Sequence, residues 1–212
     1  MRGFVVTGTD TDIGKTVFCA GLASALQASY WKPVQAGLDG ETDSQTVARL
    51  GALPDHRILA EAYRLNTPAS PHHAAALDGV EIDVDGLTIP PCNTPLIIEG
   101  AGGLLVPLTR HHVLADVLAR WQWPVIVCAR TGLGTINHTL LTIEALRSRA
   151  IPIAGIAFIG DTVPHTQQVV ADMSGVRMLG RLPRLNPLTP TTLATAFRDN
   201  VDLAALQGLC CC

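Results

Sequence analysis

The feature that most constrains this chain is a loop with glycines at both ends that joins an apolar run to a helical stretch. The run Phe4-Val5-Val6 leads into Gly8-Thr9-Asp10-Thr11-Asp12-Ile13-Gly14-Lys15-Thr16, and a helical pattern begins at Lys15. A strand that turns directly into a helix in this way is the setting of a phosphate-binding loop. Backbone N–H groups and the positive helix end would hold phosphates, Lys15 would neutralise their charge, and the Thr16 hydroxyl would bind Mg²⁺.

The loop departs from the commonest form of this motif. Gly8 and Gly14 are separated by five residues instead of four, and Thr9 stands where a glycine is expected. The alternative is an ordinary helix cap that follows a strand. Since a Gly-Lys-Thr sequence at such a turn is seldom only a cap, we predict phosphate binding.

Short apolar runs alternate with helical stretches along the rest of the chain. We predict a helix from Lys15 to about Ala28, and a later helix that Thr135 caps and that ends after Arg149-Ala150, ahead of Pro152. The remaining apolar runs occupy residues 30–31, 96–98, 125–128 and 153–159. Because these runs lack polar alternation, they predict an α/β fold with a mostly parallel sheet and helices on both faces. Ligands bind such sheets beyond the carboxyl ends of the strands.

Composition bears on domain number, partners and location. The segment 54–95, rich in Pro, Ala and Asp, is expected to cover the sheet, so residues 1–212 are predicted to form one domain. A net charge of -3 without a basic cluster argues against nucleic acid as a partner. No stretch approaches the roughly 18 to 20 apolar residues that span a membrane. The start of the chain has no small-residue cleavage site, and the cysteines lack the paired spacing of a disulfide framework. We therefore expect the protein in the cytoplasm.

Two groups of residues invite a metal-binding interpretation, which we do not adopt. The run Cys210-Cys211-Cys212 could be a metal or redox tail, but adjacent cysteines cannot easily share one tetrahedral ion. The pairs His72-His73 and His111-His112 are not spaced by four on one helix face, so we expect them in loops.

Three further residues are candidates for chemistry next to the loop. Glu99 follows the apolar run 96–98 and precedes Gly100-Ala101-Gly102-Gly103, so it could be a Mg²⁺ ligand or a polar strand end. By position alone, Asp43 fits an N-cap better than a metal ligand. Lys32 follows a strand, and Pro33 extends it toward the cleft, where it could stabilise negative charge; alone it would be a surface lysine.

The order of five short strings resembles the dethiobiotin synthetase family. The loop has the family's five-residue spacing, and a weaker similarity is found at Gly180-Arg181-Leu182-Pro183. The other matching strings are Lys32-Pro33-Val34-Gln35-Ala36-Gly37, Pro68-Ala69-Ser70-Pro71-His72, Glu99-Gly100-Ala101-Gly102-Gly103-Leu104 and Gly134-Thr135-Ile136-Asn137-His138. The resemblance implies a P-loop enzyme that uses ATP and Mg²⁺ to close CO₂ onto 7,8-diaminononanoate as a cyclic urea.

The same resemblance implies roles for individual residues. Lys15 and Lys32 would be catalytic, flanking the carbamate and the transferred phosphoryl group. The Mg²⁺ ligands would be Thr16, Asp43 and Glu99, which raises Asp43 above its capping role. The residues implied to bind the nucleotide or its phosphates and metal are Asp12, Ile13, Gly14, Lys15, Thr16, Val17, Asp43, Glu99, Gly100, Ala101, Gly102, Pro183, Arg184 and Leu185.

The resemblance also implies a homodimer with composite active sites. Ala36 would face the substrate, whereas Thr135, Ile136 and Asn137 would hold the substrate carboxylate from the other subunit. Two alternatives share the loop. An amidating synthase of the cobyric acid type carries a further glutaminase domain, for which this chain is too short. A partitioning or metallochaperone ATPase usually has a lysine where this chain has Asp10.

Three positions depart from the family pattern. Ala36 stands where the family often has Ser or Thr, so one hydroxyl contact to the substrate is lost. The run Phe158-Ile159-Gly160-Asp161 lacks the asparagine that often reads the adenine edge. Asp12 replaces a commoner glutamate or glycine, which a loop that binds through its backbone tolerates.

Overall fold

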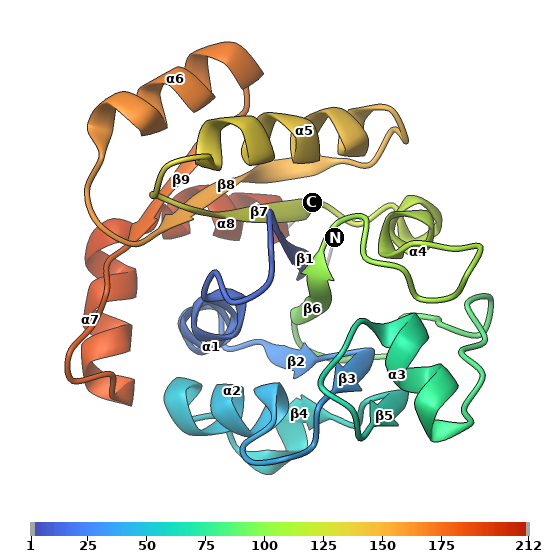
Figure 1. Ribbon diagram of the computed structural model, residues 1–212. Coiled ribbons are helices and arrows are strands. Elements are labelled where there is room, and N and C mark those ends of the chain that lie inside the picture. Colours follow the sequence, from blue (N-terminus) through green and yellow to red (C-terminus); the bar gives the residue numbers. More distant parts are fainter. Residues whose placement is uncertain (1–2, 211–212) are drawn as a thin grey trace.

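The computed structural model describes residues 3–210, and a seven-stranded sheet runs through its centre (Figure 1). The strand order is β4-β2-β6-β1-β7-β8-β9, and every pair of neighbours is parallel. The strands are β1 (Gly3–Gly8), β2 (Ser29–Trp31), β4 (Ile58–Leu59), β6 (Leu96–Gly103), β7 (Val125–Arg130), β8 (Ile153–Ile159) and β9 (Met178–Leu182). The prediction of a mostly parallel sheet is confirmed.

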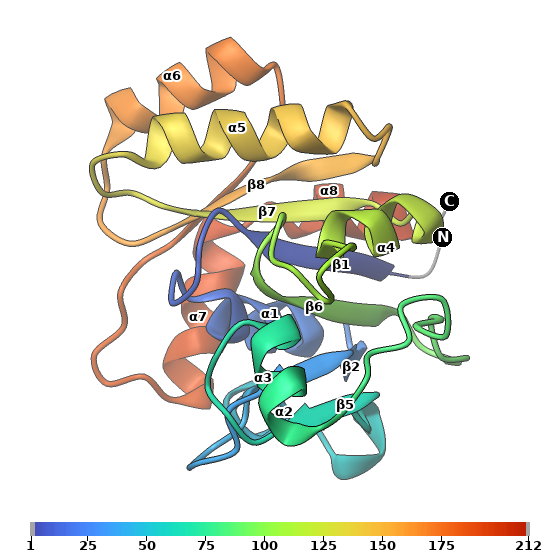
Figure 2. The same cartoon turned by 45° about the vertical axis from the view of Figure 1, so that its right-hand side comes forward.

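Helices cover both faces of this sheet, as predicted. One core cluster contains residues of α1, α2, α7 and α8, and the other contains residues of α3, α4, α5 and α6. Figure 2 shows α5 and α6 on the side of the sheet opposite to α1 and α7. The helices are α1 (Lys15–Ala25), α2 (Asp43–Gly51), α3 (Pro71–Asp78), α4 (Leu114–Trp121), α5 (Thr135–Arg147), α6 (Pro164–Ser174), α7 (Pro190–Asn200) and α8 (Leu203–Cys210).

The strands lack polar alternation because each face meets a layer of helices. In β1, Phe4 and Val6 belong to one core cluster, whereas Val5 belongs to the other, and all three are essentially unexposed. Successive side chains of a strand point to opposite faces, so a strand that is covered twice is apolar throughout. β1 lies in the centre of the sheet, between β6 and β7, and the phosphate loop follows its carboxyl end.

The segment 54–95 contributes to the sheet as well as covering it. A short helical turn, η1 (Asp55–Arg57), precedes β4, which forms one edge of the main sheet. β5 (Tyr63–Leu65) pairs with β3 (Val34–Ala36) in a separate parallel sheet of two strands. No helix among residues 3–210 is long and apolar enough to cross a membrane.

Two helices end earlier than the sequence indicated. α1 ends at Ala25 instead of near Ala28, and α5 ends before Arg149-Ala150. Just beyond each helix, one residue has a positive φ, 51° at Gln27 and 52° at Ala150. A left-handed residue cannot continue a right-handed helix, so these residues turn the chain toward the next strand.

The helix caps also differ from the prediction. Thr42, not Asp43, is the N-cap of α2, because its side chain accepts the N–H of Gln45 while the Gln45 side chain accepts the N–H of Thr42. Gly134, with a φ of 91°, precedes α5, so Thr135 is the first helical residue and not the cap.

Two further expectations require correction. Glu99 lies inside β6 and not at a strand end, because the strand continues through the glycine-rich stretch and still pairs with β1 at Gly103. His72-His73 lie in the first turn of α3, where Pro71 occupies the start of the helix, whereas His111-His112 lie in a turn before α4. Of the cysteine run at the end of the chain, Cys211 and Cys212 lie outside the described residues.

Candidate active site

The phosphate loop opens into a cavity at the carboxyl ends of β1, β2 and β6. Gly14, with a φ of 95°, precedes α1, so Lys15 and Thr16 form the start of the helix. The cavity has a volume of about 880 Å³ and is bounded by this loop, the segments that follow β2 and β3, β6, and the start of α3. Of the residues predicted to form a site, those that line it are Asp12, Gly14, Lys15, Thr16, Val17, Lys32, Ala36, Asp43, Glu99, Ala101 and Gly102.

The three residues expected to hold Mg²⁺ lie together in this cavity. Thr16 Oγ1 is 2.8 Å from Asp43 Oδ1 and 2.9 Å from Glu99 Oε1. Residues 3–210 contain no group of three or more His, Cys, Asp or Glu side chains that could bind a metal. A site here would therefore combine two carboxylates with one hydroxyl, an all-oxygen set that fits Mg²⁺.

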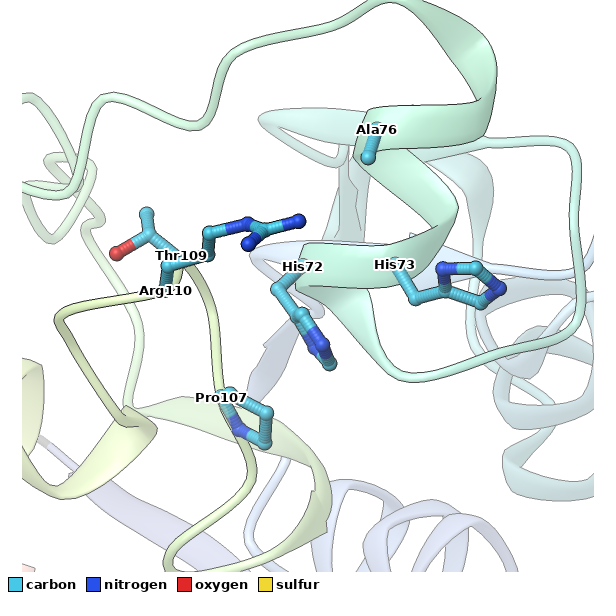
Figure 3. Close-up of a pocket in the computed structure, with 6 residues that line it drawn as sticks. All are labelled: His72, His73, Ala76, Pro107, Thr109 and Arg110. Atoms are coloured by element: carbon cyan, nitrogen blue, oxygen red, sulfur yellow. The ribbon is translucent and has the colours of Figure 1, made fainter.

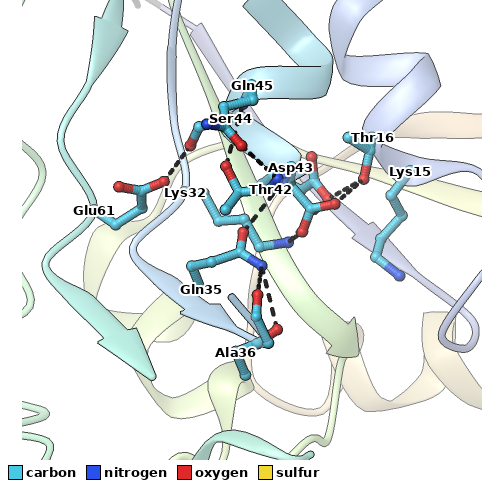
Figure 4. A network of polar contacts seen from close by, with 12 residues as sticks. Lys15, Thr16, Lys32, Gln35, Ala36, Thr42, Asp43, Ser44, Gln45 and Glu61 are labelled. Carbon is cyan, nitrogen blue, oxygen red and sulfur yellow. Dashed lines mark hydrogen bonds and ion pairs between the residues drawn. The ribbon is translucent and has the colours of Figure 1, made fainter. Parts of the chain in front are cut away.

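Lys32 forms ion pairs with both of these carboxylates. Its Nζ lies 2.5 Å from Asp43 Oδ2 and 3.1 Å from Glu99 Oε1, and its side chain is buried (Figure 4). Burial lowers the pKa of Lys32, but the charges of Glu99 and Asp43 outweigh it and raise the pKa above its usual value. The ammonium group therefore stays charged at neutral pH.

Lys15 experiences a different environment in the same cavity. Its Nζ donates a hydrogen bond to the carbonyl oxygen of Asp10 at 2.8 Å, within the phosphate loop. Burial lowers the pKa of Lys15, the Glu99 charge opposes this shift, and the Lys32 charge adds to it. A phosphate group would add a further opposite charge beside Lys15.

Gln35 of β3 holds the start of α2, and with it Asp43, in place. The buried side chain of Gln35 donates to the carbonyl oxygens of Ala36 and Gly37, each at 3.2 Å. Its carbonyl oxygen accepts the N–H of Asp43 at 3.3 Å. Together with the Thr42 cap, these bonds, which Figure 4 draws as dashed lines, fix the first turn of α2 next to Lys32.

Two polar contacts at the site were not identified from the sequence. The hydroxyl of Tyr30 donates to Glu99 Oε2 at 2.8 Å, and both residues are buried. Burial and the neighbouring Glu99 charge raise the pKa of Tyr30, so its phenol remains a donor. Arg130 forms an ion pair of 2.8 Å with Asp10 at the edge of the loop. A tyrosine in a short buried strand is the signal that could have indicated the first contact, because a buried phenol requires a partner.

Several predicted residues are not in the lining of the main cavity. Ile13 is buried, and Gly100 borders a small adjacent cavity near Trp121. The nucleotide candidates Pro183, Arg184 and Leu185 follow β9, and the substrate candidates Thr135, Ile136 and Asn137 form the start of α5.

A second cavity, of about 510 Å³, also borders the first part of α3. It is bordered by His72, His73, Ala76, Pro107, Thr109 and Arg110. Figure 3 shows the Arg110 side chain extending toward the helix turn that carries His72. His73 and Arg110 are exposed, so this cavity lacks the buried charged groups that distinguish the main one.

Comparisons with known proteins give both close relatives and distant structural neighbours. A family model described as an AAA domain matches residues 2–192. The "ATP-dependent dethiobiotin synthetase BioD" of Brucella anthropi is 59% identical over 207 residues, covering 98% of this chain and 98% of that protein. The protein of the same name from Rhizorhabdus wittichii is 64% identical over 196 residues, covering 92% and 94%.

Solved structures with similar folds are much more distant in sequence. A ParA family ATPase from Chlorobium tepidum has a TM-score of 0.54 at 14% identity, covering 97% of this chain and 92% of that chain. A structure titled as the MinC:MinD cell division protein complex of Aquifex aeolicus matches with a TM-score of 0.54 at 11% identity, covering 98% and 96%. Such likeness concerns the fold alone, which is that of P-loop NTPases.

Proposed function

The chain belongs to the ATP-dependent dethiobiotin synthetase family, and from this membership we propose that it catalyses the ATP-dependent closure of CO₂ onto 7,8-diaminononanoate. The products are dethiobiotin, ADP and phosphate, which makes the enzyme a ligase of biotin biosynthesis. The observation that carries the proposal is the meeting of Thr16, Lys32, Asp43 and Glu99 beside the phosphate loop. A cytoplasmic location is part of the same proposal.

In this proposal the loop from Asp12 to Val17 binds the ATP phosphates, and Lys15 neutralises their charge. Thr16, Asp43 and Glu99 hold Mg²⁺, which would screen the phosphate charge during phosphoryl transfer. Support comes from the donor set, in which the Thr16 hydroxyl lies within 2.9 Å of one oxygen of each of the two carboxylates. Pro183, Arg184 and Leu185 are proposed for the nucleotide side on family resemblance alone.

The chemistry proceeds in three steps. One neutral amine of the substrate adds to CO₂, loses a proton and becomes a carbamate. A carbamate oxygen then attacks the γ-phosphorus of ATP, and ADP leaves. The second amine attacks the carbonyl carbon of the mixed anhydride, expels phosphate and closes the ring. Holding both amines close to the reacting carbon is worth about 7 to 11 kcal/mol in such closures.

Lys32 stabilises the negative charge that develops during these steps. Its raised pKa keeps it charged, and its side chain lines the same cavity as Lys15 and Ala36. Since Asp43 and Glu99 hold the ammonium in place, little reorganisation is needed when the substrate binds. Ala36 lies at the substrate side and offers no hydroxyl there.

We also propose a homodimer in which each active site uses two subunits. The start of α5, at Thr135, Ile136 and Asn137, would hold the substrate carboxylate of the partner's site through its backbone N–H groups and positive dipole end. Support comes from Leu133 and Leu141, large apolar side chains that are exposed before and on α5. Association with a second subunit through this region would remove these apolar side chains from water.

The proposal is tested by following labelled CO₂ into an acid-stable product. We expect incorporation that requires the diamine, ATP and Mg²⁺ together, with one ADP formed for each labelled product. The same assay with a monoamine of equal length is the control, because a carbamate that cannot close its ring releases CO₂ in acid. ATP hydrolysis without an acid-stable product would instead favour a nucleotide-switch ATPase and reject the proposal.

A further inference from the structure

Tyr30 lies at the centre of β2, and its side chain is fully buried. In the pairing of β2 with β6, Tyr30 stands opposite Ile97, two positions before Glu99. Alternate residues of a strand share one face, so Glu99 points to the same side of β6 as Ile97. The phenol reaches diagonally along this face, and its hydroxyl donates to Glu99 Oε2 at 2.8 Å.

Because of this hydrogen bond, the two carboxylate oxygens of Glu99 have different partners. Oε2 accepts from Tyr30, whereas Oε1 lies 2.9 Å from Thr16 Oγ1 and 3.1 Å from Lys32 Nζ. The last torsion angle of a glutamate side chain can take a broad range of values, so the carboxylate plane is not fixed by the side chain itself. A fixed donor that holds one oxygen therefore restricts where the other oxygen points. Tyr30 is absent from the residues that line the cavity, so it acts on the site only through Glu99.

We propose that Tyr30 is a positioning residue that orients Glu99 for divalent-cation binding, with Oε1 turned toward Thr16 and Lys32. The inference rests on the proposed function, because it assigns Glu99 to Mg²⁺. Partners that orient a metal ligand commonly change metal affinity about 10- to 100-fold when they are removed. Tyr30 thus sets the Mg²⁺ concentration at which the enzyme works, without touching ATP or the diamine.

The test compares Tyr30→Phe with Tyr63→Phe, since these are the two tyrosines of the chain. The Tyr63 hydroxyl accepts the N–H of Asp83 at 2.9 Å and does not line the main cavity, so Tyr63→Phe is a matched loss of one phenol hydrogen bond. Mn²⁺ binding is measured by electron paramagnetic resonance with a non-hydrolysable ATP analogue. We expect about a tenfold or greater rise in the Mn²⁺ Kd for Tyr30→Phe and none for Tyr63→Phe.

Steady-state kinetics give a second readout. In Tyr30→Phe the Mg²⁺ concentration for half-maximal rate should rise, while kcat at saturating Mg²⁺ and the metal-free nucleotide Kd change little. An unchanged Mn²⁺ Kd in folded Tyr30→Phe, beside normal binding by the unsubstituted protein, overturns this inference alone. If the unsubstituted protein binds no Mn²⁺ with nucleotide, the magnesium assignment fails and the inference fails with it.

A spectroscopic measurement covers the case in which Tyr30→Phe does not fold. The Tyr63→Phe chain retains Tyr30 as its sole tyrosine, so labelling with 3-fluorotyrosine gives one ¹⁹F resonance. Adding Mg²⁺ to the complex with the ATP analogue should shift this resonance, because the hydrogen-bond acceptor of Tyr30 becomes a metal ligand. A resonance that does not respond to Mg²⁺ contradicts the inference.

Discussion

Lys15 and Lys32 line one cavity, yet their surroundings shift their pKa values in opposite directions. Burial lowers the pKa of Lys15, whereas Glu99 and Asp43 outweigh the burial of Lys32 and raise its pKa. The difference matches the proposed division of labour. Lys15 would gain its main opposite charge from a bound phosphate, whereas the charged ammonium group of Lys32 is already held in place by two carboxylates before the reaction begins.

Lys15→Ala and Lys32→Ala should therefore both abolish turnover but differ in nucleotide binding. We expect a fall in kcat of about a hundredfold or more for each, because each removes a charge that stabilises the transition state. Nucleotide titration should show weak ATP binding only for Lys15→Ala. Thermal unfolding serves as the control, since Lys32→Ala leaves two carboxylates without their partner. Near-normal activity of folded Lys32→Ala would contradict its catalytic role.

Asp43 should make stability depend on pH in the acid range. Burial opposes the shift, but Lys32 outweighs it and lowers the pKa of Asp43 below its usual value of 3.8. A carboxyl group whose folded pKa is depressed stabilises the fold above its unfolded pKa, and this stabilisation is lost as the pH falls through the folded pKa. The difference in unfolding free energy between the unsubstituted protein and Asp43→Asn should thus shrink below about pH 4. Denaturant unfolding at several pH values checks this, and a difference that grows on acidification would refute it.

Base selectivity should be weak because Phe158-Ile159-Gly160-Asp161 carries no asparagine to read the adenine edge. Selectivity comes largely from polar groups that an incorrect base leaves unpaired, and here a side chain for that purpose is missing. We expect measurable activity with CTP or GTP, determined as kcat/KM for each nucleotide. A preference for ATP above about a thousandfold would mean that other groups read the base.

At the scale of elements, the contact between α1 and α7 supports the helix that carries the phosphate loop. The rings of Phe18 and Phe197 lie 5.1 Å apart between their centroids, and both side chains are fully buried. A Cβ at Gly21 would lie 2.3 Å from the Phe197 ring. The glycine therefore allows α7 to pack closely against α1.

Gly21→Ala should lower the free energy of unfolding by about 1 to 3 kcal/mol, because an overpacked core must shift to accommodate the methyl group. The control is Gly208→Ala in α8, where a Cβ would meet no neighbouring atom of the described residues within 4 Å. Alanine is about 1 kcal/mol better than glycine inside a helix, so the control should be neutral or slightly stabilising. Equal effects of the two substitutions in urea unfolding would count against the close contact.

For the whole molecule, the proposed composite site predicts complementation between two inactive chains. Asn137 lies in the first turn of α5, where proline removes one N–H donor and is tolerated by the helix. Chains with Lys32→Ala and chains with Asn137→Pro should regain activity when mixed, because a heterodimer has one site with both halves intact. Heterodimer formation is followed by giving the two chains different affinity tags and purifying the mixture on both. Inactive mixtures in which heterodimers form and both chains bind ATP would reject the shared site.

Much of the fold follows from local sequence patterns. The apolar run before Gly8, the Gly-Lys-Thr turn and the run 153–159 predicted the central strand, the loop and β8, because burial on both faces leaves no polar alternation. Helix ends and caps were less predictable. Gln27 and Ala150 end helices with positive φ values, although neither residue type favours such a backbone.

The sequence by itself determined the phosphate loop and the residue types able to hold a charged ligand, because a loop motif is encoded by neighbouring residues. Only the tertiary structure decided that Thr16, 27 positions from Asp43 and 83 from Glu99, contacts both carboxylates. It also decided that Asp43 follows the cap of α2, and that Tyr30 faces Glu99 from the adjacent strand. Such contacts depend on strand order and register, which arise from packing the whole sheet and not from any local pattern.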